Sequence, residues 1–302
     1  MSATLIAQLS VGNELGEGIQ WRAEDASVWW TDINGKVLYH ADWPSCDIRS
    51  YAMPERLCSF AFCDREDAIL AAFESGLARL HLPSCEVEWL YKVSSLAPGM
   101  RLNDGRVDRQ GRFWVGSMVE QMEDYDKPLA ELYCFDGKPG QVPRVCETNI
   151  WISNGLCWAP KGDVMYFADS PRRTIYRYDF EGDSGIMSSR IVFASTPSGA
   201  YPDGANVDRN GNLWSAHWGA GQVVCYSPEG NILGHVKTPA SQPSCIAFGG
   251  KNLDLLFVTS ARDGLSDEAL NAEPEAGNVF VFELSGNLVT QGLAESVARH
   301  PY

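Results

Sequence analysis

Short runs of alternating apolar and polar residues cover most of the chain. Examples are SVWWTDI at 27–33, AILAAF at 68–73, NLWSAHW at 212–218 and NVFVFEL at 278–284. Runs of this length that are rich in Val, Tyr, Phe and Trp and are bounded by Gly, Pro, Asn or Asp are typical of β-strands. Because no stretch shows the apolar period of a long amphipathic helix, the pattern predicts an all-β protein.

The predicted strands recur as a repeat with six copies. Each copy has a first strand, a polar turn, an apolar strand, a second turn and a strand rich in Tyr, Val or Leu. The turns before the second strands lie about 40 to 51 residues apart, which is the period of propeller blades. These turns are at Glu24-Asp25, Glu66-Asp67, Gln110-Gly111, Lys161-Gly162, Asn210-Gly211 and Gly250-Lys251.

The repeat therefore predicts a six-bladed β-propeller that occupies residues 1–302 as a single domain. We expect the N-terminal strand ATLIAQLS at 3–10 to pair with the C-terminal strand at 278–284 and to complete the last blade. That pairing closes the ring and leaves no open sheet edge.

One position is polar in all six copies when the first strands are aligned on their turns. Glycine follows it in four copies, and glycine permits a ligand to approach the backbone closely. The aligned residues are Glu17, Ser59, Asp104, Asn154, Asp203 and Ser244. Turn chemistry is the alternative interpretation, because Asn-Gly and Asp-Gly favour turns in any β protein. A polar residue followed by glycine occurs at the same aligned position in four copies, and Glu17 is a poor turn former. These two observations favour a functional site.

The first strand of each propeller blade lines the central channel, so these side chains are expected to converge near one axial point. A ring with two or three carboxylates, an amide and no nearby lysine is unfavourable when empty. Oxygen donors of this kind suit a hard divalent cation. The sequence therefore indicates one divalent metal ion.

Charge and composition limit the kinds of partner that this protein is expected to bind. The formal net charge of -15 and the pI of about 4.7 leave no basic surface for phosphates, which argues against nucleic acid and anionic membranes. The N-terminus has no basic signal region, and no stretch approaches the ~18 apolar residues of a membrane span. Nine cysteines without a C-x-x-C pair agree with buried thiols in a cytoplasmic protein. The oligomeric state stays open.

Several ordered motifs resemble the SMP-30/gluconolactonase/regucalcin family over nearly the whole chain. The most specific are LGEGIQW, RLNDGRVDRQGRFWVGSM, ISNGLCWAPKGDVMYFADS, YPDGANVDRNGNLWSAHWG and TSARDGLSDE. Members of this family are six-bladed propellers associated with calcium or zinc, and they include bacterial sugar lactonases. The resemblance implies the same fold and a sugar lactone as the small-molecule partner.

The resemblance also implies roles for individual residues. Glu17, Asn154 and Asp203 correspond to the metal ligands, and Asp203 also to the acid/base residue. Arg101 and Asn103 correspond to substrate contacts. Gln121 stands where some animal members have a substrate-binding glutamate, with Glu120 beside it.

Other polar residues are assigned supporting places. Asp104 is expected to stand behind the site, and Ser59 and Ser244 to mark its open side. His217 is more typical of a structural strand histidine. Asp32 and Asp169, on second strands, are typical of hydrogen bonds that stabilise a blade.

Three functions remain open. The first is hydrolysis of a pentono- or hexonolactone to the aldonic acid, with the metal polarising the carbonyl and Asp203 moving the proton. The second is a promiscuous esterase or phosphotriesterase, which needs an apolar pocket. The third is a metal-binding regulatory propeller without turnover, which tolerates Asp203→Ala. Calcium, zinc, magnesium, manganese and iron(II) all remain candidates for the metal.

Overall fold

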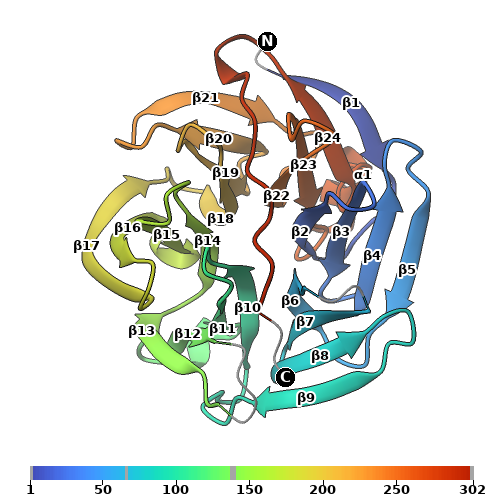
Figure 1. The fold of residues 1–302 in the computed structure, drawn as a ribbon. Coiled ribbons are helices and arrows are strands. Elements are labelled where there is room, and N and C mark those ends of the chain that lie inside the picture. The colour runs from blue at the N-terminus through green and yellow to red at the C-terminus, as the bar shows by residue number, and fades with distance from the viewer. Residues whose placement is uncertain (1–2, 65–66, 137–140, 300–302) are drawn as a thin grey trace.

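Six four-stranded antiparallel sheets form a ring in the computed structural model, which describes residues 3–64, 67–136 and 141–299 (Figure 1). The predicted six-bladed β-propeller is confirmed. In chain order the first three blades comprise β2 Gly16–Arg22, β3 Ser27–Asp32, β4 Val37–Asp42 and β5 Ile48–Ala52; β6 Leu57–Phe62, β7 Ala68–Phe73, β8 Gly76–His81 and β9 Val87–Lys92; and β10 Met100–Val107, β11 Phe113–Val119, β12 Ala130–Phe135 and β13 Arg144–Ile150. The other three comprise β14 Ser153–Trp158, β15 Val164–Asp169, β16 Thr174–Glu181 and β17 Ile186–Ser195; β18 Tyr201–Val207, β19 Leu213–Trp218, β20 Gln222–Tyr226 and β21 Ile232–Lys237; and β22 Pro243–Gly249, β23 Leu255–Ser260 and β24 Val279–Leu284 with the N-terminal β1 Ala3–Leu9.

The last blade is built from both ends of the chain. β1 pairs antiparallel with β24, from Ala3 opposite Leu284 to Leu9 opposite Val279, with a register shift between Leu5 and Ala7. The predicted closure by the N- and C-terminal strands is therefore confirmed.

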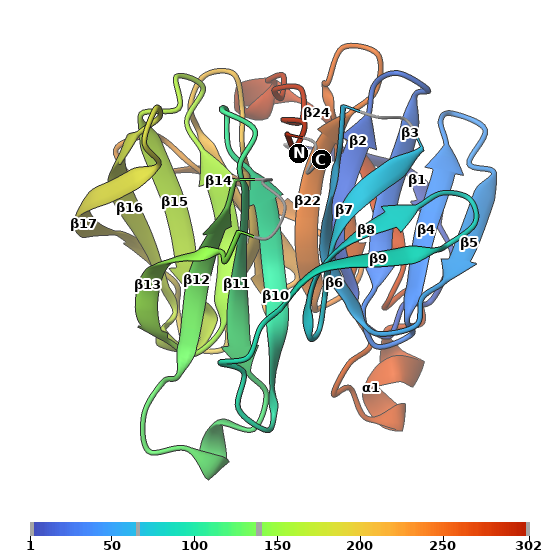
Figure 2. The same ribbon diagram turned by 60° about the horizontal axis from the view of Figure 1, so that its bottom comes forward.

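Helices are short. Within residues 3–64, 67–136 and 141–299 they are α1 Asp267–Ala272 and three 3-10 turns, Met122–Asp124, Ser170–Arg172 and Gly286–Leu288. Among the described residues, no helix has the length and apolarity needed to cross a membrane. Figure 2 shows α1 and the green loop after β11 projecting from one end of the ring, while the C-terminal segment after β24 lies at the other end.

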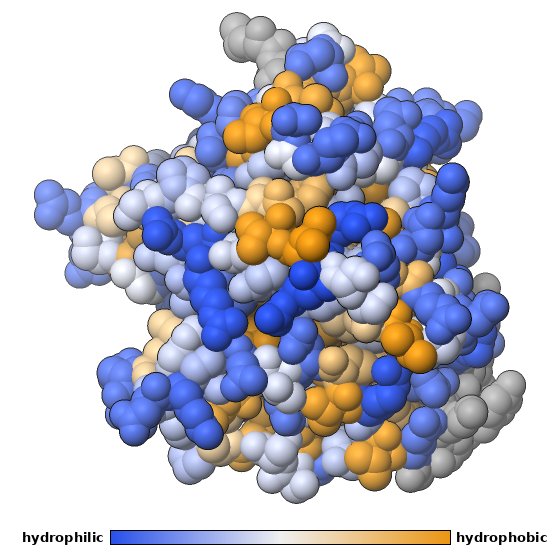
Figure 3. Space-filling view, turned by 90° about the vertical axis from the view of Figure 1, so that its left-hand side faces the viewer, coloured by the Kyte–Doolittle hydropathy of each residue, from blue (hydrophilic) through white to orange (hydrophobic). Residues whose placement is uncertain are grey.

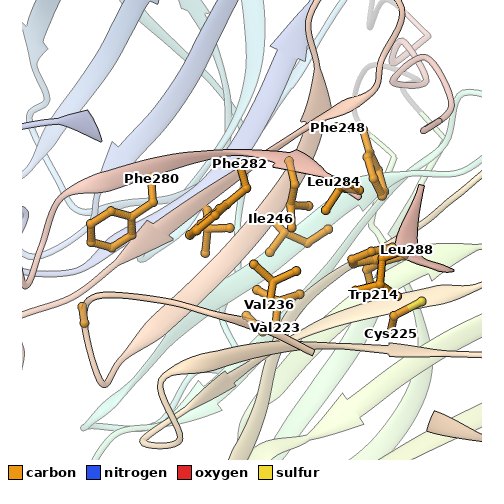
Figure 4. Close-up of a cluster of buried hydrophobic side chains, with 14 of the residues drawn as sticks. Trp214, Val223, Cys225, Val236, Ile246, Phe248, Phe280, Phe282, Leu284 and Leu288 are labelled. Atoms are coloured by element: carbon orange, nitrogen blue, oxygen red, sulfur yellow. The ribbon is translucent and has the colours of Figure 1, made fainter. Parts of the chain in front are cut away.

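Apolar side chains from adjacent blades interlock to form the core. Between the fifth and sixth blades, Trp214 of β19 meets Phe248 of β22 edge to face, with ring centroids 5.7 Å apart and planes at 88°. Figure 4 shows how the side chains of β24 and β22 lie over those of β19, β20 and β21. Because each blade buries its faces against its neighbours, the ring is stabilised as a whole.

The outermost strands are exposed and less regular in composition. β17 carries Ile186, Ile191 and Val192 at the surface. The side view in Figure 3 shows small groups of hydrophobic residues set among hydrophilic ones.

Buried aspartates fix the turns between strands. Asp208 is 0% exposed and accepts hydrogen bonds from the backbone N–H groups of Asn210 and Asn212 at 2.9 Å each, from the indole Nε1 of Trp214 at 3.1 Å and from the Thr290 hydroxyl at 2.9 Å. Thr290 belongs to the segment after β24, so Asp208 also ties the C-terminal segment to the fifth blade.

Asp32 and Asp169 act in the same way on second strands. Asp32 accepts from the backbone N–H groups of Glu14 and Leu15, at 2.9 and 3.0 Å, and Asp169 accepts from that of Ile152 at 3.2 Å. The interpretation of both residues as stabilisers of their blades is confirmed.

We expect Asp208→Ala to lower the free energy of unfolding by about 3 kcal/mol, because it leaves buried N–H and O–H donors without their acceptor. Urea unfolding followed by tryptophan fluorescence measures the change. Asp163→Ala, at an exposed aspartate in the corresponding turn of the fourth blade, is the matched control and should change stability by less than about 0.5 kcal/mol. Equal effects of the two substitutions would contradict the role of Asp208.

Candidate active site

A pocket of ≈ 450 Å³ lies where the innermost strands β2, β10, β14 and β18 approach one another. Five of the six residues predicted for the site line it, namely Glu17, Arg101, Asn103, Asn154 and Asp203. The structure thus brings together side chains that are far apart in the sequence.

Every innermost strand has an irregularity at the predicted polar position. The register of pairing shifts between Glu17 and Gln20 in β2, between Asn154 and Cys157 in β14, and correspondingly in β6, β10, β18 and β22. A β-bulge changes the direction in which a strand presents its side chains. The repeated bulge is therefore the local cause of the convergence.

The glycines that follow the polar position have two different uses. Gly155 has φ of +64°, a conformation that side chains other than glycine rarely adopt. Gly204 has no such constraint, but a Cβ atom there would lie 2.5 Å from the Cys245 sulfur of the next blade. Both glycines let neighbouring blades close tightly around the pocket.

Glu17 and Asp203 form an acidic pair at the bottom of the site. They are 8% and 6% exposed, and their carboxyl groups hydrogen-bond to each other. Burial, followed by the nearby Asp104, raises the pKa of Glu17 to about 8. Burial and the Glu17 charge raise the pKa of Asp203 well above its usual value. Without a cation the two groups share a proton.

Asn154 is oriented by a hydrogen-bond chain. Its Nδ2 donates to the Ser170 hydroxyl at 2.8 Å, and that hydroxyl donates to the Pro202 carbonyl at 2.7 Å. Because the hydroxyl's hydrogen is used, its oxygen can only accept from Asn154, and the amide oxygen of Asn154 must face the other way. Nothing in the repeat pointed to Ser170, since it lies at the end of β15 outside the aligned position.

These donors fit a hard cation. Two carboxylates that would otherwise hold a proton, and the Asn154 amide oxygen, which faces away from Ser170 and accepts from Asn103 Nδ2, form an all-oxygen set. In the described part of the chain no three His, Cys, Asp or Glu side chains gather into a ligand cluster. The candidate centre is accordingly the mixed set of Glu17, Asn154 and Asp203.

Arg101 and Asn103 lie beside these groups. The Arg101 Nη1 donates to Asn103 Oδ1 at 2.6 Å, and Asn103 Nδ2 donates to Asn154 Oδ1 at 3.1 Å and to the Ser153 carbonyl at 2.9 Å. Both residues are more than nine-tenths buried. Asn103 has its two amide hydrogens committed, so only its oxygen retains capacity for a ligand.

Gln121 does not lie in the wall of the pocket. It is exposed, just before the 3-10 turn Met122–Asp124, whereas Met122 does line the pocket. The adjacent Glu120 is the residue that contacts Arg101, at 3.1 Å from Nε.

The prediction that Ser59 and Ser244 mark an open side of the site is wrong. Both residues are 0% exposed, and the Ser244 hydroxyl is hydrogen-bonded to the Gly16 carbonyl and to Thr259 Oγ1. Short side chains at a tightly packed position do not reach the pocket. Asp104 agrees better with its expected supporting place, because its carboxylate accepts from the Leu156 backbone N–H at 3.1 Å.

Nucleophilic side chains near the site are unsuited to covalent chemistry. Burial raises the pKa of Cys58 to about 11, so the thiol stays protonated at neutral pH. Burial lowers the pKa of His217 to about 4, and its Nε2 lies 3.2 Å from the Tyr226 hydroxyl. The burial of His217 and its contact with Tyr226 agree with the expectation of a strand histidine that does no chemistry.

An apolar wall faces the polar groups. Leu15, Met118, Met122, Ile152 and Trp218 contribute to it. Tyr201 also lines the pocket, whereas Trp151 packs against the core between the third and fourth blades.

The sequence pattern that defines the SMP-30/Gluconolactonase/LRE-like region matches residues 15–262. The chain belongs to this family. This match confirms the resemblance noted from the motifs, and the matched segment contains all the candidate metal ligands and candidate substrate contacts discussed above.

Individual relatives match nearly the whole length of this chain. An L-arabinolactonase of Azospirillum brasilense is 37% identical over 92% of this chain and 91% of its own. A 6-deoxy-6-sulfogluconolactonase of Pseudomonas putida is 32% identical over 93% and 94%. The crystal structure of a calcium-binding protein, regucalcin, from Agrobacterium tumefaciens superposes with a TM-score of 0.89 at 26% identity, over 98% of each chain.

The raised pKa of Glu17 makes the stability of the metal-free protein depend on pH. The folded protein keeps this proton up to about pH 8, whereas the unfolded chain releases it near its ordinary value of 4.5. The native state then binds more protons, so the free energy of unfolding falls as pH rises through this interval.

With a chelator present, we expect the melting temperature to fall by on the order of 5 °C between about pH 5 and about pH 8. Differential scanning fluorimetry measures it. Glu17→Gln removes one of the two carboxyl groups with a raised pKa and should weaken this dependence, while Asp203 retains part of it. If the melting temperature of the metal-free wild type instead rose as the pH was raised over this range, the expected direction of the effect would be wrong.

Proposed function

We propose that this protein is a divalent-metal-dependent lactonase that hydrolyses an aldonolactone to the aldonic acid. The observation that carries the proposal is the buried pair of Glu17 and Asp203, placed beside Asn154 and Arg101 in one pocket. The names of the L-arabinolactonase and the 6-deoxy-6-sulfogluconolactonase support a sugar lactone as the substrate.

Glu17, Asn154 and Asp203 would hold the cation, with Asn154 offering the amide oxygen that Ser170 turns toward the pocket. When bound, a divalent cation supplies Lewis-acid polarisation of a carbonyl oxygen. The oxygen-only donor set favours calcium, magnesium or manganese over zinc.

Asp203 is the proposed acid/base residue. As a carboxylate it takes a proton from the water that attacks the lactone carbonyl carbon, and as the acid it returns that proton to the ring oxygen when the C–O bond breaks. The raised pKa of Asp203 belongs to the metal-free protein. With a cation bound, this pKa would be lower and the attacking water would be more acidic, so that a weakly basic carboxylate could still accept its proton.

Arg101 and Asn103 orient the substrate. The Arg101 guanidinium donates hydrogen bonds to hydroxyl or carbonyl oxygens, and the remaining lone pair of Asn103 accepts from a hydroxyl group. Gln121, which precedes Met122 at the rim, is proposed to contact a substituent that projects out of the pocket.

A panel of aldono-1,4- and 1,5-lactones assayed for acid release tests the reaction. We expect turnover that chelation abolishes and metal restores, and a loss of at least about 100-fold in kcat in Asp203→Asn. Asp163→Asn, at the surface, is the matched control. Full turnover in the Asp203 variant would exclude the mechanism, and metal binding without hydrolysis of any lactone would favour a regulatory metal-binding propeller.

The apolar wall supports one second candidate. Met118, Met122, Ile152 and Trp218 suit the acyl or aryl part of a simple ester better than a sugar hydroxyl. Including phenyl acetate and a phosphotriester in the same panel separates the two functions. A kcat/KM for these compounds above that for every lactone would favour the esterase.

Ser170→Ala tests how Asn154 is held. Without the hydroxyl the amide is free to turn, and we expect the Kd for calcium to rise by about 10-fold. Isothermal titration calorimetry measures the Kd independently of turnover. Ser45→Ala, at an exposed turn, is the control, and an unchanged Kd in Ser170→Ala would contradict the positioning role.

A further inference from the structure

Most of the hydrogen-bonding capacity of Arg101 is used inside the protein. Its Nε donates to Glu120 Oε1 at 3.1 Å, and its Nη1 donates to the Leu102 carbonyl at 3.0 Å and to Asn103 Oδ1 at 2.6 Å. Because the guanidinium is planar, fixing Nε and Nη1 also fixes the direction of Nη2. Nη2 is the nitrogen of this pocket-lining group with no partner among the described residues.

Glu120 is itself held from the neighbouring blade. Glu120 directly follows β11, and Arg56 directly precedes β6. Arg56 donates two hydrogen bonds to the Glu120 carboxylate, from Nη1 at 2.7 Å and from Nη2 at 3.0 Å. Arg56 in turn donates from Nε to Glu74 Oε2 at 2.7 Å. A two-pronged arginine–carboxylate contact has a defined geometry as well as strength.

Neither Arg56 nor Glu120 lines the pocket, and their side chains are 23% and 29% exposed, against 5% for Arg101. An isolated ion pair at this exposure contributes little to stability. The Arg56–Glu120 pair matters for another reason. Glu120 also contacts the buried Arg101, which lines the pocket, so movement of Glu120 would move the Arg101 guanidinium.

We propose that Glu120, held in place by Arg56, positions Arg101 for substrate recognition and neutralises its charge, so that the pocket presents a directed donor to an uncharged lactone. This inference rests on the proposed function, in which Arg101 contacts the substrate. Arg56 and Glu120 are positioning residues, and neither touches the lactone.

Charge explains the preference for an uncharged substrate. Within the described residues, Arg101 is the one basic side chain in the pocket wall, and Glu17, Asp203 and Asp263 are acidic. With Glu120 beside it, Arg101 offers little net attraction to a carboxylate. The neutral lactone is therefore retained while the anionic aldonate that hydrolysis produces is released.

The test compares KM for the aldonolactone that the wild type hydrolyses fastest with Ki for its own aldonate. In Glu120→Gln, a less firmly held Arg101 should raise KM about 10-fold, with kcat changed less than about twofold. Removal of the neutralising charge should lower Ki for the aldonate by roughly fivefold. A role in folding alone would not move these two constants in opposite directions.

Arg56→Met provides the complementary variant, since it removes the outer cation and leaves Glu120 on Arg101. We expect KM to rise about threefold and Ki for the aldonate to rise as well. Glu88→Gln, which removes a carboxylate paired with Arg79 at the outer strands β8 and β9, is the matched control and should change neither constant.

Arg101→Ala separates failure of this inference from failure of the proposed function. If Arg101→Ala raises KM but Glu120→Gln leaves KM and Ki within about twofold of the wild type, the positioning role is wrong and the substrate contact stands. If Arg101→Ala leaves KM unchanged, the substrate contact itself is wrong, and the inference fails with it. Melting temperatures and calcium Kd values of all variants identify any that are misfolded.

Discussion

The contact between the buried carboxyl groups of Glu17 and Asp203 is the interaction on which the site depends. Two acids placed together away from water disfavour ionisation of both, which is why the pKa values of both are raised. Such a pair is unfavourable for folding unless a proton or a cation balances it. The surrounding elements therefore have to hold it in place: the bulged innermost strands, the glycines that let blades close and the aspartates that fix the turns.

Stability in this ring and chemistry at its axis come from different side chains of each blade. Apolar side chains packed between neighbouring blades, such as Trp214 of β19 against Phe248 of β22, supply the buried apolar area. The innermost strands supply the polar side chains at one repeated bulge. Because the two tasks are separated in this way, six similar blades can carry unequal residues at the axis without changing the fold.

The repeat made the fold and part of the site predictable. Glu17, Asn154 and Asp203 share one phase of the repeat, so their convergence in one pocket follows once the ring is recognised. Ser170 and Glu120 share no phase with them: Ser170 meets Asn154 across the β14–β15 pair, and Glu120 meets Arg56 across 64 positions of sequence. Ser59 and Ser244 share the phase but have short side chains that are buried by packing. Their position in the repeat alone therefore led to the wrong prediction that they border the site.

The pairing of β1 with β24 has a consequence for how the protein is made. β1 is the first strand to be synthesised and its partner is the last strand of the final blade. Five blades can assemble while the chain grows, yet the ring cannot close until β24 has been synthesised. Until then the N-terminal strand and the neighbouring sheet expose unpaired edges, which are the features by which nascent β proteins associate wrongly. Closure of this propeller thus follows the synthesis of its last strand, and the interval before it is when the nascent chain is most exposed to chaperones and to aggregation.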